Sequence, residues 1–184
     1  NMPEEVGGAG LDVLTWLLYE KELGKTSYAL HWNCVGRPSN ILLAGTPQQR
    51  EKYLFPCIKG EKSDCLAMTE PGAGSDLRGM KMTAVRDGSD FVLNGTKHFI
   101  SHADRADFAI VFAASGEEET PRGKKKRITA FFVDKGWPGF TVRDGYRNVS
   151  HRGYTNSILD FDNCRVPQEA VLGEVHRGFE VANQ

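Results

Sequence analysis

The sequence predicts an α+β protein in which a helical N-terminal segment precedes a β-barrel-like domain. Residues 1 to about 62 show helical spacing and helix-capping residues but no strand pattern. After about residue 80, short apolar runs alternate with turn signals at a spacing typical of a small barrel or sandwich. With 184 residues, 40% of them hydrophobic and 26% charged, the chain is long enough to bury a core and has an ordinary globular composition.

Three helical stretches are expected in the first part of the chain. The first covers residues 11–23, where leucines recur at mostly helical spacing. The second lies between Tyr28 and Ala44. The third begins at Thr46, which forms a capping box with Gln49, and Pro56 is expected to end or bend it.

The rest of the chain is expected to form strands until a helix begins at Gly178. Asp87-Gly88 and Asn94-Gly95 are typical of hairpin turns, and the charged residues 116–119 and 124–127 are expected to form a solvated loop. The expected strands cover residues 65–68, 82–86, 91–93, 96–101, 108–113, 128–133, 140–143 and 157–161.

The charge and the cysteines restrict the class of protein. A formal net charge of -1 gives no support for a nucleic-acid partner or a role at a membrane surface. No apolar run approaches membrane-spanning length and no signal peptide is evident, so we expect no membrane insertion. Four widely spaced cysteines indicate reduced, mostly buried thiols in an intracellular compartment: Cys34, Cys57, Cys65 and Cys164.

Residues 65–79 are the densest candidate for a ligand site. A short apolar run reaches Pro71 and is followed by Gly72, Gly74 and Gly79, which let a backbone approach a ligand or bind an anion through its amides. The segment has neither the lysine of a P-loop nor a Gly-x-Gly-x-x-Gly pattern opening a helix. Thr69 in this segment, like Ser75, has a hydroxyl that suits a ring heteroatom, a phosphate oxygen or a local turn.

This segment, Ala-Met-Thr-Glu-Pro-Gly-Ala-Gly-Ser-Asp-Leu-Arg-Gly at residues 67–79, resembles the flavin-binding signature of acyl-CoA dehydrogenases. Residues 161–167 resemble a later block of that family, and residues 3–11 and 178–179 resemble further landmarks in the same order. The resemblance implies a fragment that contains the end of an α-helical N-terminal domain (1–62) and a middle β domain (63–172). It would also contain the start of a C-terminal helical domain (173–184), truncated before the helical bundle.

The resemblance implies FAD as cofactor and assigns residues to it. Thr69, with the backbone of Leu66, Ala67 and Met68, would hold the pyrimidine side of the isoalloxazine ring. Gly74 and Ser75 would face the pyrophosphate, and Ser75 also the pantetheine of CoA.

A second segment, Phe99-Ile100-Ser101, resembles the Trp-Ile-Thr or Trp-Ile-Ser that is common at this position in the family. Phe99 would lie against the flavin without the indole donor, and the Ser101 hydroxyl would bond the flavin N5 edge. Lys125 falls where the family has a substrate contact.

The implied reaction is the α,β-dehydrogenation of an acyl-CoA thioester, as in fatty-acid β-oxidation, with hydride transfer to flavin N5. Its base would be a glutamate beyond Gln184, so the 184-residue chain alone is predicted to be inactive. The implied partners are acyl-CoA, an electron-transferring flavoprotein and further copies in a homodimer or homotetramer, in bacterial cytoplasm or the mitochondrial matrix. Two alternatives stay open: a related flavin oxidase or monooxygenase, and a non-catalytic flavin or acyl-CoA binding module.

Several other candidates have a structural interpretation. His98 and His102 lie four apart in a strand pattern, where residues four apart are distant, so we expect no metal site. Glu70 and Asp76 are expected to order the loop. Three residues of the second helical stretch could line an acyl cavity: His31, Trp32 and Arg37. The alternative is that the first two pack in the core and the arginine lies on the surface.

Overall fold

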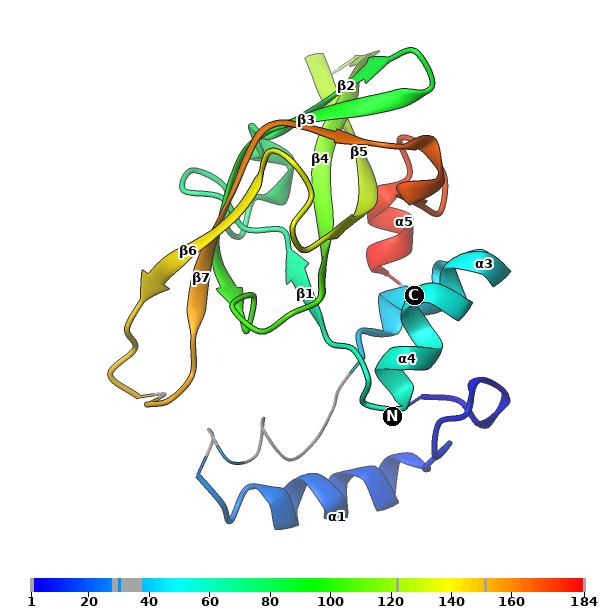
Figure 1. The fold of residues 1–184 in the computed structure, drawn as a ribbon, viewed down its shortest axis with the longest axis vertical. Helices are drawn as coiled ribbons and strands as arrows, with labels where there is room; N and C mark the ends of the chain where they lie inside the picture. Colours follow the sequence, from blue (N-terminus) through cyan, green and yellow to red (C-terminus); the bar gives the residue numbers. More distant parts are fainter. Residues whose placement is uncertain (1, 28–29, 31–37, 122, 151, 184) are drawn as a thin grey trace.

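The computed structural model describes residues 2–27, 30, 38–121, 123–150 and 152–183. Short helices lie beside one curled β-sheet, and α1 (Val13–Leu23) lies at the lower end of the molecule (Figure 1). The predicted fold class, a helical segment followed by a β-barrel-like domain, is confirmed. In the described part of the chain, no helix has the length and apolar character needed to cross a membrane. The other helical segments are η1 (Glu4–Val6), η2 (Asn40–Ala44), α3 (Pro47–Gln49), η3 (Arg50–Leu54), α4 (Phe55–Ile58), η4 (Leu77–Gly79), η5 (Gln168–Ala170) and α5 (Gly178–Ala182).

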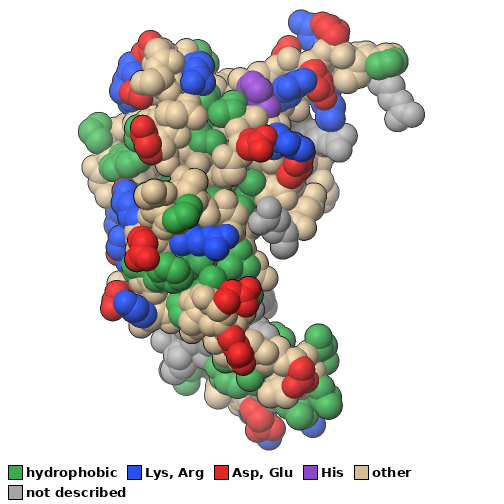
Figure 2. Space-filling model, turned by 90° about the vertical axis from the view of Figure 1, so that its right-hand side faces the viewer, with side chains coloured by type: hydrophobic (Ala, Val, Ile, Leu, Met, Phe, Trp, Pro, Cys, Tyr) green, Lys and Arg blue, Asp and Glu red, His purple; other side chains and the backbone are tan. Residues whose placement is uncertain are grey.

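Helix α1 confirms the prediction for residues 11–23. The Asp12 carboxylate caps it by accepting hydrogen bonds from the Thr15 amide at 3.0 Å and the Thr15 hydroxyl at 2.7 Å. None of its side chains is buried. Four of its hydrophobic side chains are more than half exposed: Val13, Leu14, Leu17 and Leu18. Figure 2 shows exposed hydrophobic side chains at this lower end of the molecule.

The third predicted helix also begins as expected. The Gln49 amide donates to the Thr46 hydroxyl at 3.2 Å, and the Thr46 amide donates to Gln49 Oε1 at 3.0 Å. Pro56 does not end the helix, because the wider π-helical turns of η3 precede it and α4 continues to Ile58. The carbonyl of Lys52, four residues before this proline, accepts a hydrogen bond from Lys62 Nζ at 3.1 Å.

The second expected helix is described only in part. Asn40–Ala44 forms the 3₁₀ segment η2. Residues 28–29 and 31–37, among them His31, Trp32 and Arg37, lie outside the described residues.

Eight strands form one sheet in the order β6-β7-β3-β2-β4-β5-β8, with β1 paired in parallel to β4. Because the sheet curls (Figure 1), one of its faces encloses a core while the other receives the helices. The strands are β1 (Asp64–Ala67), β2 (Thr83–Asp87), β3 (Asp90–Ser101), β4 (Phe108–Thr120), β5 (Gly123–Asp134), β6 (Phe140–Tyr146), β7 (Asn156–Val166) and β8 (Val171–Leu172).

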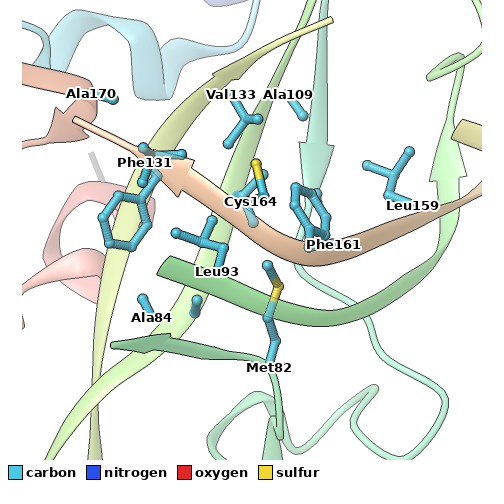
Figure 3. Packing of buried hydrophobic residues seen from close by; sticks show 14 of the residues in the cluster. Met82, Ala84, Leu93, Ala109, Phe131, Val133, Leu159, Phe161, Cys164 and Ala170 are labelled. Carbon is cyan, nitrogen blue, oxygen red and sulfur yellow. The ribbon is translucent and has the colours of Figure 1, made fainter. Parts of the chain in front are cut away.

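Two apolar clusters cover the two faces of the sheet. Figure 3 shows the enclosed cluster, to which Leu93, Phe131 and Cys164 belong. Strand β4 contributes to both clusters, because its odd-numbered residues from Ala109 to Ala113 face the enclosed cluster and its even-numbered residues from Phe108 to Phe112 face the helices.

The helical segment is anchored to the sheet by aromatic packing. Tyr53 of η3 is buried and stacks on Phe132 of β5, with ring centroids 4.1 Å apart. Burying each side chain of this size is worth roughly 1.5–3 kcal/mol. The short helical segments, unlike α1, therefore share one packed interior with the sheet.

The predicted hairpin turn at Asn94-Gly95 is wrong. Strand β3 runs through both residues without a turn, and its pairing with β7 shifts between Leu93 and Gly95, which marks a β-bulge. Gly95 has a φ of 145°, and a Cβ atom there would lie 2.8 Å from Met82 Cβ. Glycine is thus required by close packing within a strand. The turn predicted at Asp87-Gly88 is confirmed, since it joins β2 to β3.

The predicted charged loop at residues 116–127 is also wrong. Strands β4 and β5 continue to Thr120 and from Gly123, so these residues extend a hairpin. Its glutamates lie opposite its lysines, with Glu119 paired to Lys124 and Glu118 to Lys125. The complementary charges stabilise pairing where we expected a loop.

Candidate functional site

The glycine-rich loop follows β1, as predicted. Pro71 and Gly72 are the central residues of a turn. Two hydrogen bonds close it: the Glu70 amide donates to the Ala73 carbonyl at 2.9 Å, and the Ala73 amide donates to the Glu70 carbonyl at 3.1 Å. The chain therefore reverses directly after Thr69.

Gly72 and Gly74 leave open space beside this backbone. A Cβ atom built at either position would meet no heavy atom within 4 Å. Packing among the described residues therefore does not require glycine there, in contrast to Gly95. Bare backbone of this kind lets a ligand approach the loop amides.

A buried ion pair fixes the loop at both of its ends. Lys97 Nζ lies 2.8 Å from Glu70 Oε1 and donates to the Met68 carbonyl at 3.0 Å. Glu70 also accepts hydrogen bonds from the amides of Lys81 at 2.5 Å and Met82 at 3.1 Å. Burial lowers the pKa of Lys97, and the hydrogen bond to Glu70 opposes that shift. Glu70 thus orders the loop, as predicted.

Lys97 is not among the site residues expected from the sequence, although the sequence contains a signal for its burial. Phe91, Leu93 and Lys97 have even spacing along β3, and such positions share one face of a strand. A lysine on the buried face of a strand needs a partner that accepts hydrogen bonds. The spacing alone could have indicated a buried ion pair, but the identity of its partner depended on the fold.

The pairing of β3 with β7 contains a second bulge, this one on β3 at the predicted aromatic position. From Lys97 to Ile100, three steps along β3 face two steps along β7. Phe99 in this bulge has a φ of 55°, a left-handed conformation that costs about 1–3 kcal/mol in a non-glycine residue. Its ring points outward, is 47% exposed and stacks on Tyr146, with ring centroids 4.1 Å apart.

The loop and this bulge are joined directly. The His98 amide donates to the Thr69 carbonyl at 3.0 Å. At the end of β3, Ser101 accepts a hydrogen bond from the hydroxyl of Tyr154. The structure therefore brings together two segments, residues 66–69 and 99–101, for which the family resemblance implies contacts to the flavin.

The predicted site residues differ in whether their side chain or only their backbone can reach a ligand. Ala67 and Ile100 are buried, so only their backbone can face a ligand, whereas Leu66 is 39% exposed. Thr69 is half-buried and Ser75 is exposed. Neither of these two hydroxyls has a hydrogen-bond partner among the described residues. Both are therefore available to a ligand.

Lys125 lies apart from this site. Its Nζ is 3.1 Å from Glu118 Oε1 across the β4–β5 hairpin. It lines a hollow of about 450 Å³, together with Arg127 and His176, that contains none of residues 66–69 or 99–101. Lys126 connects the hairpin to the end of the loop, because its Nζ donates to the Met80 carbonyl at 2.5 Å. On the face that Figure 2 shows, cationic and acidic side chains are interspersed.

Burial disfavours the reactive thiolate form of the described cysteines. Cys57, Cys65 and Cys164 are free and buried, as predicted. Burial raises the pKa of all three, to about 12 for Cys57 and about 11 for Cys164. Cys34 lies outside the described residues.

The histidines of β3 and the following turn contact tyrosine side chains. His98 Nδ1 lies 3.1 Å from the Tyr146 hydroxyl, and the His102 ring meets Tyr154 edge-on. Within the described ranges, no group of three or more His, Cys, Asp and Glu side chains has a geometry that could hold a metal ion.

Comparisons with known proteins match both parts of the chain. The family described as the N-terminal domain of acyl-CoA dehydrogenase matches residues 1–61, and the middle domain of the same enzymes matches residues 65–164. The human mitochondrial short-chain specific acyl-CoA dehydrogenase is 35% identical over 100% of this chain and 45% of its own length. Subunit CarC of the caffeyl-CoA reductase-Etf complex of Acetobacterium woodii is 37% identical over 99% of this chain and 48% of its own length.

A solved structure shares the fold over the whole chain. The acyl-CoA dehydrogenase of Bacillus anthracis, complexed with FAD, superposes with a TM-score of 0.82 at 29% identity, covering 99% of this chain and 31% of that one. The chain spans less than half the length of these relatives. Because the two matched domains cover most of its residues, in the order of helices and sheet that the structure shows, the chain belongs to the acyl-CoA dehydrogenase family.

Proposed function

We propose that this chain forms the flavin- and substrate-binding part of an FAD-dependent acyl-CoA dehydrogenase. The observation that carries the proposal is the direct junction between the glycine-rich loop and the β3 bulge. Lys97 joins them through Glu70 and Met68, and His98 joins them through Thr69. A related structure is described as complexed with FAD, which supports this cofactor.

The residues at the junction fit a flavin. Its ring system has apolar faces and a polar edge, and the junction presents the exposed side chains of Leu66 and Phe99 beside the hydroxyls of Thr69 and Ser101. The open backbone at Gly74 and the exposed hydroxyl of Ser75 suit a pyrophosphate. When bound, FAD would supply the hydride acceptor for oxidation of the acyl chain.

The chain's own task in this reaction is positioning. Dehydrogenation removes a proton from the α-carbon of the thioester and a hydride from the β-carbon, so both bonds must be aligned with the acceptor. The buried pair of Lys97 and Glu70 holds the loop and the bulge in one arrangement. Ser75 and Lys125 are the proposed contacts to the CoA part of the substrate. We expect the base that takes the α-proton to be a glutamate outside these 184 residues.

The proposed partners follow from the relatives. CarC is named as a subunit of a complex with Etf, which supports an electron-transferring flavoprotein as the electron acceptor. We propose a homodimer or homotetramer. The relatives include mitochondrial and bacterial enzymes, and we propose the matrix or the bacterial cytoplasm accordingly.

A titration with FAD tests the proposed cofactor site. In the natural polypeptide that contains this chain, Thr69→Val and Ser101→Ala should each raise the Kd for FAD roughly two- to tenfold, because each removes one hydrogen bond. Thr83→Val is the matched control, since Thr83 is exposed on β2 and outside the site. Equal affinity in all four proteins would contradict the assignment.

Turnover assays test the reaction itself. The natural polypeptide should oxidise an acyl-CoA when an electron acceptor is present, and the isolated 184-residue chain should not. Turnover by the isolated chain would show that the base lies within it. FAD binding without any turnover by the natural polypeptide would instead favour the non-catalytic binding module, and rapid reoxidation by oxygen would favour an oxidase.

A further inference from the structure

The connection between β6 and β7 brings a residue to the site that the proposed function does not yet use. Tyr154 lies two residues before β7, and its hydroxyl donates a hydrogen bond to Oγ of Ser101, 53 positions away in the sequence. Ser101 is the last residue of β3 and the one proposed to face the flavin N5 edge. Tyr154 therefore contacts the side chain that the proposed function assigns to the flavin.

Contacts on both sides fix this hydrogen bond. The Tyr154 ring meets the His102 ring edge-on, with centroids 4.5 Å apart and 76° between the planes. The His102 amide donates to the Thr155 carbonyl at 3.1 Å. Ser101 pairs with Asn156 across β3 and β7. The backbone segments that carry the two side chains are thus held side by side, while the rotamer of the Ser101 hydroxyl depends on Tyr154.

The direction of the hydrogen bond determines what Ser101 can do. A serine hydroxyl has one hydrogen and two lone pairs. Because Tyr154 donates to one lone pair, the hydrogen of Ser101 is left for a second acceptor. A hydroxyl that accepts one hydrogen bond also becomes a stronger donor of the next, since neighbouring hydrogen bonds polarise one another.

We propose that Tyr154 is a positioning residue that orients the Ser101 hydroxyl toward a ring-nitrogen acceptor of the bound cofactor. The inference rests on the proposed function, in which this acceptor is N5 of the flavin. Without the phenolic hydroxyl, the Ser101 side chain is free to rotate among its staggered positions. The donor would then be weaker while the shape of the site stays the same.

A double-mutant cycle tests this inference in the natural polypeptide that contains the chain. Two quantities are measured for Tyr154→Phe, Ser101→Ala and the double variant: the Kd for FAD and the reduction potential of bound FAD. Tyr154→Phe should raise the Kd roughly two- to tenfold. It should also shift the potential in the same direction as Ser101→Ala, by a smaller amount. In the Ser101→Ala background, Tyr154→Phe should change neither quantity, because it acts only through that hydroxyl.

Two further variants complete the design. Tyr53→Phe removes a phenolic hydroxyl from the helical part of the molecule and should leave both quantities unchanged. Tyr154→His keeps a ring with a hydrogen-bond donor and should lie between the wild type and Tyr154→Phe. It also provides the comparison if Tyr154→Phe does not fold, which thermal unfolding would reveal.

The outcomes separate the inference from the function on which it rests. Equal effects of Tyr154→Phe in both backgrounds would show that Tyr154 acts on the fold alone and would overturn the inference. An unchanged Kd and potential in Tyr154→Phe would overturn it as well. Failure of the unsubstituted polypeptide to bind FAD would overturn the proposed function first, before any variant is compared.

Discussion

Two lysine–glutamate pairs in this molecule have similar lengths and opposite surroundings. Lys97 and Glu70 lie 2.8 Å apart, with side chains 0% and 4% exposed. Lys125 and Glu118 lie 3.1 Å apart near the tip of the β4–β5 hairpin, with side chains 47% and 29% exposed. Water and salt can replace a lost partner at the tip but not in the interior. The buried pair therefore fixes geometry, while the exposed pair only supports a register that the strands already share.

The position of each pair agrees with this difference. The buried pair holds the segment that contains Thr69 against the strand that contains Phe99, so its loss would move two parts of the proposed flavin site. The exposed pair lies on a hairpin whose backbone ladder continues from the buried part of β4 and β5. Substituting one residue of either pair measures how much burial of the pair contributes to the free energy of unfolding.

The largest effect is expected from Lys97→Met. The substitution leaves the Glu70 carboxylate buried without its cation, and such a loss costs about 3–5 kcal/mol in the free energy of unfolding. Urea unfolding measures it. The control is the double variant Lys97→Met with Glu70→Gln, which removes the uncompensated charge and should recover part of the loss. If the double variant is as unstable as the single one, the cost comes from packing and the comparison fails.

Asp64 is a second largely buried carboxylate, and its partner is a backbone amide instead of a lysine. Asp64 accepts a hydrogen bond from the Ser39 amide at 3.2 Å, and burial raises the pKa of Asp64 to about 6. Because its folded-state pKa lies above the unfolded value of about 4, the native state binds the proton more tightly. The contribution of Asp64 to stability is therefore fully present below about pH 4 and is lost as the pH rises through about 6.

The variant Asp64→Asn isolates this contribution. Between about pH 4 and pH 7, the wild type should lose roughly 1–3 kcal/mol of unfolding free energy relative to the variant. Denaturant unfolding at a series of pH values measures the difference. A difference that does not change with pH would show that Asp64 is well solvated and that burial is not the deciding variable.

The smallest effect is expected from Glu118→Gln. The hydrogen bond from Lys125, followed by the charges of Lys125 and Arg127, lowers the pKa of Glu118. Its contribution is therefore present above the unfolded pKa and is lost as the pH falls through the lower folded pKa. We expect a slight decrease in the thermal midpoint that disappears at high salt, because exposed pairs are screened. A decrease that persists at high salt would show that the hairpin tip is as dependent on its charges as the interior.

Elements determined by neighbouring residues were predictable. The helix capped at Asp12 and the capping box of Thr46 and Gln49 depend on groups three residues apart, and both occur. The glycine-rich loop after β1 was predictable for the same reason. The two wrong predictions, at residues 94–95 and 116–127, concern strand length, which depends on a partner strand elsewhere in the chain. Asn94-Gly95 stays within β3 because β7 pairs with β3 on both sides of it, and the extra residue of the bulge lies on β7, where Asp162 and Asn163 face Asn94.

By itself, the sequence determined where glycines, hydroxyl-bearing side chains and apolar runs lie along the chain, and the order of its motifs indicated the family. Only the tertiary structure decided which of them meet. Lys97 reaches Glu70 across 27 positions, and Tyr154 reaches Ser101 across 53. Such contacts depend on the register of β3 with β7 and on two bulges, which arise from the packing of the whole sheet and have no local signal in the chain.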